Sequence, residues 1–112
     1  MKDDRVYIAH IIECLKWIDD YLSEGKETFF ADRKTQSAVL RELQTLAEST
    51  QHLSMMLKDS HPEVGWDGIA GFRNVLVHDY LGINLDRVWQ IIENDLPAFR
   101  AAIKSIHEEL KD

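Results

Sequence analysis

The chain has 112 residues, of which 45% are hydrophobic, and this length fits one domain, residues 1–112, with a single core. A formal net charge of −7 argues against broad, nonspecific binding of nucleic acid, although it leaves room for one local cationic cleft. The single cysteine excludes an intrachain disulfide, and no stretch is apolar enough for a signal peptide or a membrane span. We therefore expect a soluble cytoplasmic protein with no membrane partner.

Apolar residues recur at helical rather than alternating spacing, and the chain contains only two prolines and five glycines, which predicts an all-α domain. The first helix is predicted from about Asp4 to Ser23 and is ended by Gly25, with an apolar stripe made of Ile8, Ile12, Leu15, Ile18 and Leu22. A loop, EGKETFFA, is predicted to follow it. The second helix is predicted from about Asp32 to Lys58, with one apolar side made of Val39, Leu43, Leu46, Leu53 and Leu57.

A break is predicted at DSHPEVG, which contains Pro62 and Gly65. Asp67 is a candidate N-cap for a third helix, and Gly82 is a candidate residue just beyond its C-terminus.

The fourth helix is predicted to begin LDRVWQII, with Asn84 as its cap. Pro97 must kink or restart this helix, and Asp95 is a candidate second cap. The complete pattern predicts an antiparallel four-helix bundle with a kinked or split C-terminal helix.

The segment RNVLVHDY, residues 73–80, brings a permanent cation, an amide, an imidazole and a phenol within about two helical turns. Asn74 and His78 are four residues apart and share a helix face, so the amide can orient the imidazole. Arg73 and His78 are separated by about 140° around an ideal helix, so they flank a groove more readily than they touch. If two copies of this helix pair about a twofold axis, both arginines and both histidines converge on one cleft.

These groups fit the cleavage of RNA without a metal ion. The ribose 2′-hydroxyl must lose a proton, the leaving oxygen must gain one, and the phosphorus centre needs a cation beside it. His78 lies near the predicted C-terminus of its helix, where the helix dipole favours the imidazolium form. Because DNA lacks the attacking hydroxyl, the expected substrate is RNA. No cofactor and no metal site are predicted, since His10 and Cys14 are four residues apart but no second pair of ligands accompanies them.

In order, the motif contains Arg73, Asn74, three further residues, His78, Asp79 and Tyr80. This order resembles the signature of HEPN domains, and specifically of the HepT-like toxins, in which a tyrosine follows two places after the histidine. The preceding PEVGWDGIAGF and the later DRVWQIIENDLPAF also resemble that group, so the likeness covers most of the chain.

The resemblance implies an all-helical homodimer that is the toxin of a toxin–antitoxin pair, acting as a metal-independent endoribonuclease with Arg73 and His78 as its active residues. It further implies a partner, an antitoxin of the minimal nucleotidyltransferase type, which transfers AMP from ATP to Tyr80. A bulky anionic group on Tyr80 would occupy the phosphate site and pair with its arginines.

Each of these residues also has a simpler interpretation. Arg73 could form a surface ion pair, His78 could lie at a helix end without chemistry, and Tyr80 could anchor the helix by packing its ring. Two other functions stay open at this point: a noncatalytic HEPN module that binds nucleotide or a partner protein, and a purely structural dimerisation domain.

Overall fold

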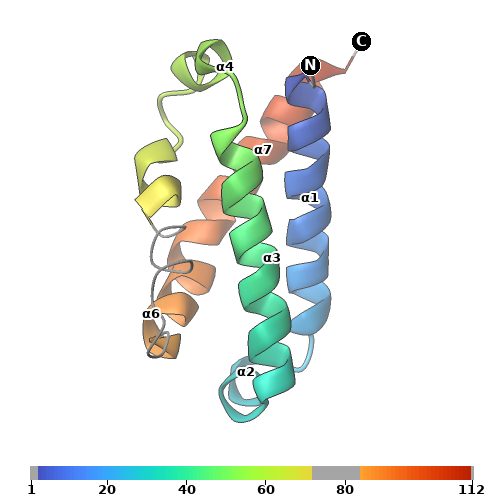
Figure 1. Cartoon of the computed structure of the whole chain (residues 1–112), viewed down its shortest axis with the longest axis vertical. Coiled ribbons are helices and arrows are strands. Elements are labelled where there is room, and N and C mark those ends of the chain that lie inside the picture. The colour runs from blue at the N-terminus through green and yellow to red at the C-terminus, as the bar shows by residue number, and fades with distance from the viewer. Residues whose placement is uncertain (1–2, 72–83, 112) are drawn as a thin grey trace.

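The computed structural model describes residues 3–71 and 84–111. Three long helices form the body of the fold (Figure 1): α1 (Asp4–Tyr21), α3 (Arg33–Gln51) and α7 (Leu96–Leu110). The first of them, α1, packs against both α3 and α7 and runs antiparallel to each. The all-α prediction is confirmed, because the described residues form helices and turns and no strand. None of the described helices is long and apolar enough to cross a membrane.

The core lies between the three long helices, each of which turns one apolar stripe inward. On α1 this stripe includes Ile11, which is fully buried, whereas the predicted Ile12 is only partly buried. Cys14 lies in the same stripe, and burial raises the pKa of its thiol to about 12, so the side chain packs as a small neutral group. The largest fully buried side chains of the three helices are Ile8, Ile11, Ile18, Val39, Leu43, Leu46, Leu96, Ile103 and Ile106.

A short helix, α2 (Lys26–Ala31), occupies the segment EGKETFFA, so the prediction of a loop is wrong. Its Phe29 is fully buried, and this burial stabilises a helix too short to show a helical period in the sequence. The preceding α1 ends at Tyr21, earlier than predicted. Gly25 instead lies just before α2 with φ at 96°, a left-handed conformation that favours glycine.

The predicted second helix is two helices, α3 and α4 (Met55–Ser60), separated at Ser54. The Ser54 hydroxyl accepts a hydrogen bond from the Leu57 backbone N–H at 3.1 Å and so caps α4. Ser54 also donates to Asp4, from its backbone N to Oδ1 at 2.8 Å and from its hydroxyl to Oδ2 at 2.7 Å. The break therefore depends on a contact with the start of α1, 50 residues away in the sequence.

Replacing Ser54 by alanine is expected to lower the free energy of unfolding by about 1 to 2 kcal/mol, because the cap of α4 and one bond to Asp4 are both lost. Urea denaturation of the two proteins measures this difference. Ser60→Ala is the matched control, since among the described residues the Ser60 hydroxyl bonds only the Met56 carbonyl within the same short helix. Equal losses in the two variants would contradict the anchoring role of Ser54.

The C-terminal part of the fold is split, as predicted, into α6 (Leu85–Gln90), a π-helical turn η1 (Ile91–Asp95) and α7. Asn84 caps α6 as predicted, because its Oδ1 accepts from the Arg87 backbone N–H at 3.2 Å. Pro97 lies in the first turn of α7, where proline is common, directly after the π-helical turn. Asp95 takes the predicted N-cap position of α7, but its side chain makes no capping hydrogen bond, since its backbone is helical and continues the π-helical turn into α7.

Candidate functional site

The sequence-predicted site residues, Arg73, Asn74, His78 and Tyr80, lie outside the described residues, as does Gly82. The structure describes the two flanks of the motif, which are the chain up to Gly71 and the chain from Asn84 onward.

The chain enters the motif through residues 66–71, which are helical. Asp67 lies inside this helix, so it is not the N-cap that the sequence predicted. The Trp66 indole N–H is shared between two backbone carbonyls, those of Lys58 at 3.2 Å and His61 at 3.0 Å. Ile69, only 6% exposed, is part of the hydrophobic core. These contacts hold residues 66–71, which lead into the motif, against the body of the protein.

His61 lies in the turn before residues 66–71, and its side chain links this turn to the C-terminal end of α7. Its Nδ1 lies 3.2 Å from Glu63 Oε2 and its Nε2 lies 3.0 Å from Glu109 Oε2, while the side chain is only 12% exposed. A hydrogen bond from its own backbone N–H, and then the contact with His61, hold the pKa of the Glu63 carboxyl below its ordinary value. The Glu63 carboxylate is therefore already in contact with His61.

The chain leaves the motif at Asn84 and continues directly into α6. Val88 of this helix is buried, and Trp89 packs against the aromatic rings of α2, with centroids 5.3 Å from Phe29 and 6.1 Å from Phe30. The ammonium group of Lys26 lies 5.9 Å from the Trp89 ring centroid, within range of a cation–π interaction. The helix α2, which the sequence did not predict, therefore packs against α6 and stabilises the chain that follows the motif.

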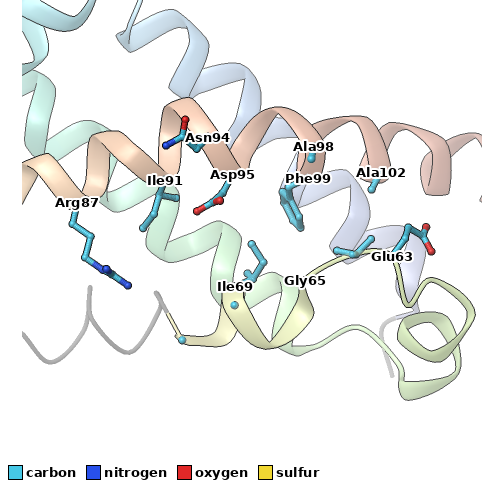
Figure 2. A pocket seen from close by; sticks show the side chains of 13 residues that line it. Glu63, Gly65, Ile69, Arg87, Ile91, Asn94, Asp95, Ala98, Phe99 and Ala102 are labelled. Atoms are coloured by element: carbon cyan, nitrogen blue, oxygen red, sulfur yellow. The ribbon is translucent and has the colours of Figure 1, made fainter.

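A groove of about 730 Å³ lies between the two flanks (Figure 2). We call it the flank groove. One wall is formed by the segment from Glu63 to Gly71, and the other by α6, η1 and the start of α7, with Arg87, Ile91, Asn94, Asp95 and Phe99. In the sequence, Arg73 follows Gly71 of this wall by two residues.

The sequence predicts a cap at Asp95 and no role for Arg87, so it does not predict the flank groove. A signal was present, because Arg87, Ile91 and Asp95 follow one another in steps of four and therefore share one side of a helix.

The comparisons with known proteins agree on one family. The family model described as Ribonuclease HepT-like matches residues 11–106. A protein of Methanocaldococcus jannaschii named "putative RNase" is 37% identical over 112 residues, covering 99% of this chain and 90% of its own length. A "probable ribonuclease HepT" of Thermococcus cleftensis is 29% identical over 108 residues, covering 96% of this chain and 98% of its own.

A longer relative from Methanocaldococcus jannaschii is named "gamma-glutamylcyclotransferase and putative RNase". It is 30% identical over 110 residues, which cover 97% of this chain but only 50% of the relative. This chain thus spans half the length of that protein. The comparison with solved structures gave no significant match.

Proposed function

Because this chain belongs to the ribonuclease HepT-like family, we propose that it is a metal-independent endoribonuclease whose active residues are Arg73 and His78. The observation that carries this proposal is the family match over residues 11–106, which contains the whole motif from Arg73 to Tyr80. The anchored flanks and the groove beside Gly71 support it, because a substrate needs a concave surface next to the reacting groups.

The chemistry follows from the groups that the motif provides. His78 takes the proton from the ribose 2′-hydroxyl, whose oxygen attacks the adjacent phosphorus and displaces the 5′-oxygen of the next nucleotide. The leaving oxygen takes a proton from a second imidazole. Arg73 stabilises the negative charge that develops on the phosphate oxygens. The products are a 2′,3′-cyclic phosphate and a free 5′-hydroxyl.

One chain supplies a single histidine and a single arginine at the motif, so the proposed site is shared between two copies in a homodimer. A twofold axis beside the motif helix would place one imidazole as the base and its symmetry mate as the acid. Asn74 holds the imidazole in one orientation from its position one turn earlier.

The proposed regulation acts on Tyr80. A minimal nucleotidyltransferase antitoxin transfers AMP from ATP to the Tyr80 hydroxyl and releases pyrophosphate, which blocks the cleft with an anionic group. The protein is then the toxin of a toxin–antitoxin pair acting in the cytoplasm, with RNA as substrate and the antitoxin as partner.

The proposed function is tested with unmodified protein, confirmed by intact mass, and a mixed RNA pool in excess chelator. We expect cleavage with cyclic-phosphate ends, and no cleavage of a DNA pool of the same sequences, because DNA lacks the attacking hydroxyl. A folded, unmodified dimer that leaves the RNA intact, with or without added divalent metal, would contradict the enzyme and favour a noncatalytic binding module. Cleavage only with added metal would contradict the metal-free chemistry.

A further inference from the structure

We infer that the flank groove binds one nucleotide of a single-stranded RNA next to the motif, with the phosphate on Arg87 and the base beside Ile91. We infer also that Asp95 reads the edge of this base and prefers guanine. The inference rests on the proposed function for its substrate class, but it concerns residues outside the motif.

Arg87 is a cation without a partner among residues 3–71 and 84–111. The Arg87 backbone N–H donates a hydrogen bond to Asn84 Oδ1, which fixes the backbone from which the side chain extends. The guanidinium forms no ion pair with any residue in these two ranges. Arg100 shows the contrast, since two of its guanidinium nitrogens bind Asp19 at 2.6 and 2.8 Å. An exposed guanidinium on a groove wall is a ready donor for phosphate oxygens, because its fork of N–H groups matches their geometry.

The side chains of Arg87, Ile91 and Asp95 lie in sequence along the same wall of the groove, as Figure 2 shows. Arg87 and Asp95 are eight positions apart in the sequence, which corresponds to about 12 Å along the axis at the rise of an α-helix. This length is enough to place a phosphate at one end and the outer edge of a base at the other. Ile91 is half-buried between them and offers an apolar surface to the face of the base.

The negative charge of Asp95 indicates which part of the nucleotide lies at each end of the groove wall. Its carboxylate is exposed, makes no capping bond and repels phosphate, so the backbone is expected at Arg87. A carboxylate accepts hydrogen bonds only, and guanine presents two adjacent donors, N1–H and the exocyclic N2–H, on one edge. The neighbouring Asn94 adds an amide that can both donate and accept. The second carboxylate of the groove, Glu63, is already engaged with His61.

The dimensions of the groove suit such a ligand. Its volume of about 730 Å³ lies within the range of small-molecule sites. Gly68 and Gly65 lie on the wall opposite α6, and a Cβ at either position would meet no atom of residues 3–71 or 84–111 within 4 Å.

The test measures RNA binding in a His78→Ala background, which prevents cleavage, by fluorescence anisotropy. The probes are an oligoadenylate and the same strand with one central guanosine. Arg87→Ala is expected to weaken binding of both strands about tenfold and to reduce the slope of log K against log salt by about one. Asp95→Asn is expected to remove the preference for the guanosine strand, which we expect to be roughly tenfold before the substitution.

Two matched controls lie outside the groove. Lys104→Ala removes an exposed cation from α7, and Asp86→Asn neutralises an exposed carboxylate on α6. Neither is expected to change the affinity by more than about twofold or to change base preference, because exposed charges away from the ligand are screened.

The outcomes separate this inference from the proposed function. If the wild type cleaves RNA but Arg87→Ala and Asp95→Asn bind both strands as their controls do, the inference is wrong and the ribonuclease stands. If binding depends on both residues but the wild type does not cleave, the groove stands and the enzyme is contradicted. Light scattering of each variant completes the test: loss of the dimer in Arg87→Ala would assign the groove to a second copy of the chain and overturn the inference.

Discussion

His78→Ala is expected to cleave RNA about 10²- to 10⁴-fold more slowly than the wild type, because the site loses its acid and base groups. Arg73→Ala is expected to lose about 10²- to 10³-fold, because the charge that develops on the phosphate is then no longer stabilised. Initial rates of cleavage in excess chelator measure both effects. Thermal melting of each variant checks that the fold is unchanged.

The matched controls for these variants are His107→Ala and Arg41→Ala. His107 lies in the last turn of α7 and Arg41 is exposed on α3, so each variant removes the same kind of group from a position outside the motif. Both are expected to cleave at nearly the wild-type rate. If His78→Ala kept wild-type activity, the imidazole would have no chemical role and the proposed mechanism would be wrong.

Tyr80→Phe is expected to abolish AMP transfer completely, because the phenol oxygen is the proposed acceptor of the nucleotidyl group. The wild type, incubated with the proposed nucleotidyltransferase antitoxin, ATP and Mg²⁺, should gain the mass of AMP and lose its RNA cleavage. Tyr80→Phe should gain no mass under the same conditions. Intact mass spectrometry and the cleavage assay together measure this result.

Tyr21→Phe is the matched control for Tyr80→Phe, because Tyr21 lies on α1 and stacks on Trp17 at 5.9 Å. It should accept AMP on Tyr80 as the wild type does. Modification of Tyr80→Phe to the same extent as the wild type would place the acceptor elsewhere and contradict the proposed regulation.

The long helices could be predicted from the sequence because each has enough turns to show an apolar period. The prediction for α1 was accurate at its start, Asp4, and the cap at Asn84 was correct, since both signals are local. The irregular turn before α7 was also predicted, because Pro97 lacks the N–H that would bond the preceding turn and its ring clashes with that turn.

The errors have a different cause, which is contact between segments far apart in the sequence. The break at Ser54 depends on hydrogen bonds to Asp4, and the capping serine alone does not distinguish it from a serine inside one long helix. The helix α2 depends on the burial of Phe29 and on its packing against Trp89, 60 residues later. A six-residue helix is too short to be stable without such contacts.

The two parts of the candidate site differ in the same way. The motif could be recognised because Arg73, Asn74, His78 and Tyr80 lie within eight consecutive residues, and their proposed roles remain predictions. The flank groove could not be recognised, because it exists only where the segment before the motif faces the helices that follow it. Arg87 and Asp95 become candidates for RNA contact only in that arrangement.

The central claim is that two copies of the motif share one catalytic cleft. It is tested most directly by a mixed dimer of one wild-type copy and one copy with both Arg73→Ala and His78→Ala, purified through two different tags. A shared cleft predicts cleavage at least about 10²-fold slower than the wild-type dimer, because one acid or base group is missing. A rate of one half of the wild type would show that each chain has a complete site of its own and would contradict the claim.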